Sequence, residues 1–422
     1  MKGRMTIFRR FWKLVVKVGP AFYLIGYCIG TGSVVSMASA GSRYGMSLLW
    51  ALFLSCLFSF VMMEAFGRYT AVTGKTSLSG FREIPTFGTP VAIITLIGSI
   101  FVEIMSLIGI MGIVTDLIAE WSRMFVSEAG WDPVLIAVII IIAVYLLIWV
   151  GRYSFLENVL ICFVTLIAVS FLLTMFIVIP SPKDILIGAI PRMPDEPNAS
   201  MIIAAIVGST IGASVFVVRS ILVREKNWGP EQLGTERIDT FFATFSLFVI
   251  SMAIMASAAG TLYLVGKPVE DAITMVVLLK PLAGQFALTI FITGTVAAGI
   301  SSIIPVALLA PMLIADFRGI PMDMKSTSFR LICVLPLLFG LTVPIFHARP
   351  VLAMIISQSF QVFVLPIVTI TIMYLVNRRD VMGRYKAGLW LNSGLVAMLL
   401  FSFVISYQSV LGMVEYFRIL KG

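Results

Sequence analysis

Long apolar runs, separated by short polar stretches, make up most of the chain. They have the length that crosses a bilayer as a helix and lack the ten-residue alternation of a membrane β-barrel strand. We predict an all-α integral membrane protein with one transmembrane domain over residues 1–422. The eleven predicted spans are about 14–40, 46–70, 90–118, 133–150, 157–180, 200–224, 240–263, 282–314, 329–347, 351–376 and 387–413.

Composition and charge agree with this pattern. The chain is 59% hydrophobic and 12% charged, which excludes a soluble domain. With a cytoplasmic N-terminus, the inner loops and helix ends carry 21 of the 30 Lys and Arg residues, and the outer ones carry 9. The positive-inside rule therefore predicts a multi-pass protein of the cell membrane, of the prokaryotic inner-membrane kind, with the C-terminus outside. The same bias accounts for the net charge of +9, because the basic residues gather at the inner face of the lipid bilayer, and no nucleic-acid partner is expected.

Two predicted spans contain small and hydroxylic residues near their middle. The first reads "GYCIGTGSVVS" (26–36) and the sixth "IVGSTIGASVF" (206–216), five helices later. A five-helix repeat is inverted in its second copy, and matched interruptions of this kind indicate a transporter's central site. We therefore predict broken helices within inverted repeats at about 14–180 and 200–376, plus an extra helix at about 387–413. Close helix packing through the small residues is the alternative.

The stretch "GPAFYLIGYCIGTGSVVSMASAGSRYGMSLLW" resembles the first helix, and the loop after it, of the Nramp (natural resistance-associated macrophage protein) divalent-metal transporters. Other segments resemble the family in the expected order: "VTGK" (72–75), "GRYSFLE" (151–157), "AAGISS" (297–302), "SQSFQVFVLP" (357–366) and "RRDVMG" (378–383). The resemblance implies a LeuT-type fold, with two inverted five-helix repeats and an eleventh helix.

The chain departs from the family where the resemblance would place the metal. The family's D-P-G-N falls on Gly30-Thr31-Gly32-Ser33, and its M-P-H falls on Gly212-Ala213-Ser214. A family glutamine falls on Val364, and a second histidine of the sixth span falls on Arg219. The side-chain ligands for a transition metal are therefore replaced, and no resident metal or cofactor is expected.

This departure shapes the predicted function. Half-helix N-termini present positive dipole ends, and without the carboxylate they favour an anionic or zwitterionic solute. The predicted substrate-binding residues are Gly30, Thr31, Gly32, Ser33, Ser209, Thr210, Gly212, Ala213 and Ser214. Alternatively, the chain transports a hydrated divalent cation such as Mg²⁺ or Mn²⁺, with or without proton coupling, or is a transport-inactive sensor or scaffold. No catalytic motif favours an enzyme.

Three charged residues within or near the spans are candidates for coupling or relay, with H⁺ or Na⁺ as the coupling ion. Glu103 lies inside the third span without a basic residue within a turn, which favours it as a proton relay. Glu64 precedes Arg68 by four residues, which favours a structural ion pair. Arg219 is expected to extend to the inner surface. His347, the one histidine, is expected in an outer loop.

Overall fold

The structure is a computed structural model that describes residues 19–123, 130–150, 153–178, 180–194, 198–269, 280–346 and 349–421. The described residues contain helices and no strand. The longer helices are α2 (Gly19–Cys28), α3 (Thr31–Tyr44), α4 (Leu49–Thr73), α6 (Gly88–Arg123), α7 (Pro133–Trp149), α8 (Tyr153–Ile177), α10 (Ala199–Thr210), α11 (Ala213–Glu225), α12 (Leu233–Thr261), α14 (Lys280–Arg318), α15 (Thr327–Phe339), α17 (Pro350–Gln361), α18 (Leu365–Asn377) and α20 (Leu389–Lys421). The shorter ones are α5 (Ser77–Arg82), α9 (Pro182–Gly188), α16 (Thr342–Phe346), α19 (Arg379–Met382), η1 (Pro230–Gln232), η2 (Tyr263–Val265) and η3 (Gly383–Tyr385).

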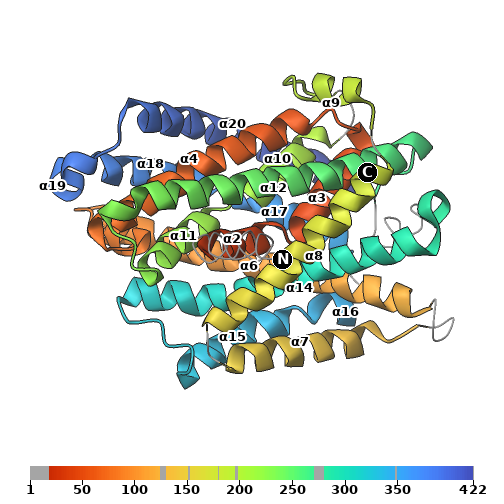
Figure 1. Cartoon of the computed structure of the whole chain (residues 1–422), viewed down its shortest axis with the longest axis horizontal. Coiled ribbons are helices and arrows are strands. Elements are labelled where there is room, and N and C mark those ends of the chain that lie inside the picture. The colour runs from red at the N-terminus through yellow and green to blue at the C-terminus, as the bar shows by residue number, and fades with distance from the viewer. Residues whose placement is uncertain are drawn as a thin grey trace, which may run out of the picture.

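The longer helices run roughly side by side across the molecule (Figure 1). Among the described residues, eight helices are long and apolar enough to cross a membrane, or nine if the bent pair α2 and α3 counts as one span. The apolar helix α7 has 17 residues and is one residue too short to be counted among them. His347 lies outside the described residues, so its predicted loop position is not tested.

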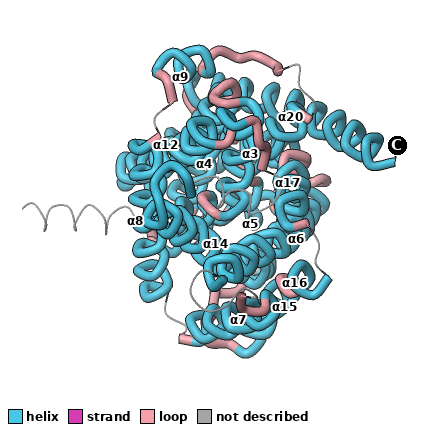
Figure 2. The backbone as a smooth tube through the Cα atoms, turned by 90° about the vertical axis from the view of Figure 1, so that its right-hand side faces the viewer, coloured by secondary structure: helices cyan, strands magenta, loops and turns pink. Residues whose placement is uncertain are grey.

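The helices form an inner group and an outer group. The most apolar 18 residues of the span made by α10 and α11 are all buried. Of the most apolar 18 residues of α20, only 28% are buried. Figure 2, which looks along the helices, shows α3 among other helices and α7, α15 and α20 at the periphery. The outer faces carry large exposed apolar side chains, among them Ile97, Leu146, Phe176 and Leu400. Such faces are suited to lipid.

Candidate functional site

The first membrane span is interrupted near its middle. Helix α2 ends at Cys28 and α3 begins at Thr31, with a 52° bend between them. Gly30 has an extended backbone, with φ −96° and ψ −173°. The Ser33 hydroxyl donates to the Cys28 carbonyl at 2.6 Å and so satisfies a carbonyl group at the end of α2. The predicted break in this span is confirmed.

The sixth span is interrupted in the same way. Ile211 and Gly212 separate α10 from α11, and Ile211 has φ −117° and ψ 69°, outside the helical region. The Ser59 hydroxyl of α4 donates to the Thr210 carbonyl at 2.8 Å, so a neighbouring helix supports this break. The predicted break is confirmed here too.

A third break, which the sequence analysis did not predict, separates α17 from α18 at residues 362–364. Pro366 explains it, because proline lacks the amide hydrogen and its ring clashes with the carbonyl four residues earlier. That carbonyl belongs to Val362, and it accepts a hydrogen bond of 3.0 Å from Ser406 of α20. The proline within an apolar run was the signal for this break.

A small cavity lies where the three broken helices approach α6 and α14. Its volume is about 30 Å³, room for roughly two water molecules. Across it, the Ser33 hydroxyl lies 3.3 Å from the Ser209 carbonyl, which joins the first two breaks. The lining residues are Tyr27, Cys28, Gly30, Gly32, Ser33, Glu103, Ser106, Ile110, Gly208, Ser209, Val215, Ser302, Val306, Gln358 and Gln361.

Glu103 of α6 is the one carboxylate among these lining residues, and only 4% of it is exposed. Its Oε1 atom accepts hydrogen bonds from the Tyr27 hydroxyl at 2.6 Å and the Ser214 hydroxyl at 2.8 Å. The amide nitrogen of Gln361 lies 3.5 Å from the same oxygen. These donors offset part of the cost of burying a carboxylate, and they come from three different broken spans.

Two glutamines of α17 form the other polar wall of the cavity. The Gln358 amide donates to the Ser106 hydroxyl at 3.2 Å, and the Gln361 amide donates to the Gln358 side-chain oxygen at 3.4 Å. Neither glutamine is among the predicted site residues, although two amides within one turn of an apolar span are an intramembrane polar signal. Tyr27 and Ser106 are likewise site residues that were not predicted.

The structure brings some of the predicted substrate-binding residues to the cavity and leaves others outside its lining. Gly30, Gly32, Ser33 and Ser209 line the cavity. Thr31, Thr210, Gly212, Ala213 and Ser214 are not among its lining residues. Ser214 nevertheless reaches the cavity through its bond to Glu103.

Several predicted hydroxyls are already used by the backbone. Ser209 donates to the Ile206 carbonyl at 2.9 Å, and Thr210 lies 3.0 Å from the same carbonyl. Because a hydroxyl has one hydrogen to donate, these two side chains do not offer it to a solute in this conformation.

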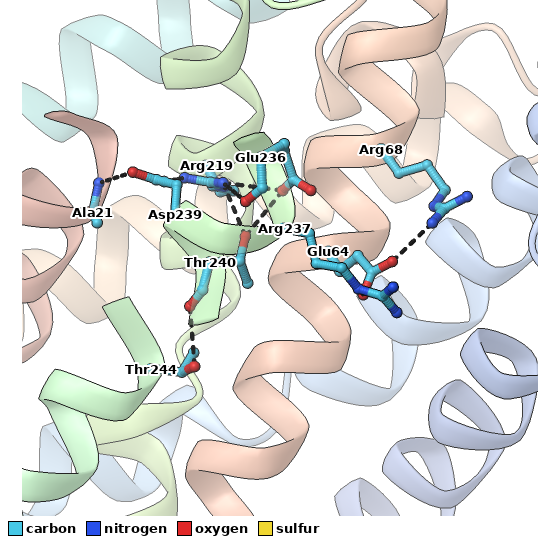
Figure 3. Close-up of polar contacts among 9 residues, drawn as sticks. All are labelled: Ala21, Glu64, Arg68, Arg219, Glu236, Arg237, Asp239, Thr240 and Thr244. Atoms are coloured by element: carbon cyan, nitrogen blue, oxygen red, sulfur yellow. Dashed lines mark hydrogen bonds and ion pairs between the residues drawn. The ribbon is translucent and has the colours of Figure 1, made fainter. Parts of the chain in front are cut away.

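Glu64 of α4 lies in a different environment, shown in Figure 3. Arg68 contacts one of its oxygens at 2.8 Å, and the Nε atom of Arg237 lies 3.3 Å from the other. The pairing with Arg68 that the sequence predicts is confirmed. The carboxylate also ties α4 to α12.

Arg219 does not extend to the surface, so that expectation was wrong. It is completely buried and forms ion pairs with Asp239 and with Glu236, the latter at 3.0 Å (Figure 3). Asp239 also accepts a hydrogen bond from the backbone nitrogen of Ala21, 3.2 Å away, in α2. The two acidic residues lie one turn apart on α12, and they supply the counter-charges that burial of the guanidinium requires.

Comparison with known proteins adds a family and a fold. The profile of the family described as "Natural resistance-associated macrophage protein-like" (Nramp) matches residues 21–412. A protein of Nostoc sp. named divalent metal cation transporter MntH is 25% identical over 402 residues, covering 91% of this chain and 88% of that protein. The MntH of Verminephrobacter eiseniae is 24% identical, covering 93% and 88%.

Solved structures show the same arrangement of helices. A variant of the Eremococcus coleocola manganese transporter superimposes with a TM-score of 0.76 at 16% identity, covering 96% of this chain and 89% of that one. MhsT in complex with L-phenylalanine gives 0.65 at 12% identity, covering 94% and 98%. The fold is the LeuT type that these transporters share, and the inverted five-helix repeats and the extra helix stay predictions.

Proposed function

The chain belongs to the Nramp family, and on that premise we propose that it is a secondary transporter of hydrated divalent cations, with Glu103 as the charged residue of its central site. This proposal takes the cation alternative in place of the anionic or zwitterionic solute. The observation that carries it is the buried Glu103 carboxylate among the cavity-lining residues.

The charge of the cavity supports a cation. Its described lining residues include one carboxylate and no lysine, arginine or histidine. An anionic solute would therefore meet an anionic side chain without a basic partner, and burying two like charges together is costly. A divalent cation would instead meet one full negative charge, the oxygen atoms of side-chain amides and hydroxyls, and any free backbone carbonyls.

The ligand set supports a cation that keeps part of its water. Within the described residues, no group of three or more His, Cys, Asp or Glu side chains is arranged to hold a metal ion. Mg²⁺ usually keeps several waters and binds through one or two carboxylates. Oxygen-rich surroundings also suit Mn²⁺, whereas the Cys28 thiol is the one soft side chain among the lining residues.

The size of the cavity requires movement during transport. About 30 Å³ holds only roughly two waters, so a hydrated ion enters only when one side widens. Alternating access around a site between broken helices provides that widening. The names of the curated relatives, divalent metal cation transporters, also favour a cation as the substrate.

Uptake into proteoliposomes tests the proposal. The full chain is reconstituted, and Mg²⁺ and Mn²⁺ entry is followed with an internal fluorescent indicator. We expect saturable uptake of both ions by the wild type and loss of uptake in Glu103→Gln. Glu120→Gln is the matched control, because Glu120 lies on the same helix but pairs with Arg123 at the partly exposed helix end.

Each outcome has a defined meaning. Uptake by Glu103→Gln at the wild-type rate would contradict the role of this carboxylate. If the folded wild type neither binds nor transports either cation, the proposed function is contradicted and the sensor or scaffold alternative is favoured.

The Cys28→Ser variant should transport Mg²⁺ normally, since a hard cation gains little from sulfur.

A further inference from the structure

A second cavity, with a volume of about 220 Å³, lies at the far ends of three of the helices that form the central site. Its lining residues are Arg43, Asn198, Met201, Ile202, Val269, Arg349, Val351, Leu352 and Ile355. Arg43 lies in the last turn of α3, Asn198 directly before α10, and Arg349 directly before α17. By the predicted topology this cavity opens toward the outer face.

The charge of this cavity is opposite to that of the central one. Two arginines line it, and no acidic residue is among its described lining residues. No ion pair of Arg43 or Arg349 occurs among the described residues, although most other arginines with described side chains have carboxylate, carbonyl or ring partners. The Nε atom of Arg43 is buried and has no hydrogen-bond partner. Two positive charges therefore share one cavity without a described counter-charge.

The backbone adds to this positive potential. Asn198 and Arg349 are the N-cap residues of α10 and α17, which are both 12 residues long, and neither side chain caps its helix. The first amide groups of a helix and its dipole both favour a negative charge. Asn198 has a left-handed backbone (φ 66°), and its side-chain oxygen is buried without a partner. This oxygen only accepts hydrogen bonds, so it is available to a protonated oxygen of a ligand or to ligand-bound water.

We propose that this cavity binds a phosphate-type oxyanion, either free phosphate or the headgroup phosphate of a lipid. Guanidinium groups bind such oxyanions through paired, charge-assisted hydrogen bonds. The inference is independent of the cation proposed for the central site, because it concerns different residues and is tested by binding alone.

The position of this anion site gives it a consequence for transport. Along α3, α10 and α17, its polar residues Arg43, Asn198 and Arg349 lie about 14–15 Å from the nearest lining residues of the central cavity. A bound oxyanion would join the ends of these three helices, each of which is one half of a broken span. Binding would therefore favour the conformation described here over one in which these ends separate.

Thermal unfolding of the full chain in detergent tests the binding. Inorganic phosphate and sulfate are titrated at constant ionic strength against chloride, and the wild type is expected to show a saturable rise in Tm. Arg43→Gln/Arg349→Gln should lose this rise, and each single change should weaken apparent affinity about tenfold or more. Arg123→Gln should keep it, because this arginine of the same predicted face pairs with Glu120.

Nanodiscs separate the two sources of phosphate. If phosphatidylglycerol, added to phosphatidylcholine, raises the Tm of the wild type but not of the double variant, the ligand is a lipid headgroup. If only free phosphate does so, the ligand is the free ion. No saturable response of the wild type to any of these anions would overturn the proposal, and so would an equal response of the double variant. Should the double variant fail to fold, Arg349→Gln decides, because this exposed side chain makes no hydrogen bond among the described residues.

Discussion

The hydroxyl of Tyr27 lies 2.6 Å from Oε1 of Glu103 and so joins the broken first span to the continuous helix α6. Tyr27 is the last tyrosine before the break at Gly30, and its side chain is buried. The hydroxyl also lies 2.8 Å from Ser214 in the second half of the sixth span. Since a hydroxyl donates one hydrogen, Tyr27 and Ser214 each donate to the carboxylate and hold it between α2 and α11.

Removing the Tyr27 hydroxyl should destabilise the protein while leaving the volume of the cavity nearly unchanged. We expect Tyr27→Phe to lower the free energy of unfolding by about 1–3 kcal/mol, because a buried carboxylate loses a charged hydrogen bond. The measurement is thermal unfolding in detergent. Tyr374→Phe is the control, since Tyr374 is 48% exposed. In a protein that already carries Glu103→Gln, Tyr27→Phe should lower the free energy of unfolding by less. An unchanged loss would show that the hydroxyl stabilises the protein through a partner other than Glu103.

If residues 30, 33 and 212 align with the metal ligands of the family, building a metal site at these positions requires a further change. A Cβ atom at residue 30 would lie 2.6 Å from the Cβ of Ser302 and would overlap its hydroxyl. We therefore expect Gly30→Asp/Ser33→Asn/Gly212→Met to fold poorly, whereas the addition of Ser302→Gly should give a folded protein that binds Mn²⁺ more tightly than the wild type. Titration calorimetry measures the affinity.

The predicted cost of this added change is modest. Ser302→Gly removes a 3.0 Å hydrogen bond to the Gly26 carbonyl, a loss of about 1 kcal/mol. Ser302→Gly alone is the control and should not gain Mn²⁺ affinity. If the quadruple variant folds and binds Mn²⁺ no better than the wild type, the alignment of residues 30, 33 and 212 with metal ligands is refuted.

Arg219 should be essential for folding because of its charge. Arg219→Met leaves Asp239 and Glu236 buried without their cation, and we expect a loss of about 3–5 kcal/mol. Arg219→Met/Glu236→Gln/Asp239→Asn should recover much of this loss, because no charge remains unpaired. Detergent-stable yield and Tm provide the measurement, and a triple variant as unstable as the single one would argue against charge pairing.

The two intramembrane carboxylates should differ in a proton-gradient assay. If transport is proton-driven, Glu103→Gln should abolish the pH dependence of uptake, because this side chain lines the central cavity and has no ion pair among the described residues. Glu64→Gln should mainly lower Tm, because Arg68 and Arg237 both lose their partner. Uptake that still follows an imposed pH gradient in Glu103→Gln would favour Na⁺ coupling or uniport.

The local features of the site were accessible from the sequence, and its long-range contacts were not. Glycines and hydroxylic residues in an apolar run predicted the first two breaks, because they weaken a helix locally. The contact of Gln361 with Glu103, however, spans 258 positions and depends on how α17 packs against α6. Likewise, the burial of Arg219 depends on its ion pairs with Glu236 and Asp239 of α12, which no local pattern specifies.

Helix α20 follows in the sequence the helix that its hydrogen bonds support. It lies largely outside the inner helices, yet Ser406 and Ser409 donate hydrogen bonds of 3.0 Å to the carbonyls of Val362 and Ser359, next to the glutamines that face the cavity. Chains fold as they are synthesised, and α20 follows α17. These two hydrogen bonds to the helix that carries the polar wall therefore form only after α20 has been synthesised. A ribosome-bound chain that ends before α20 should carry an α17 without its outer support.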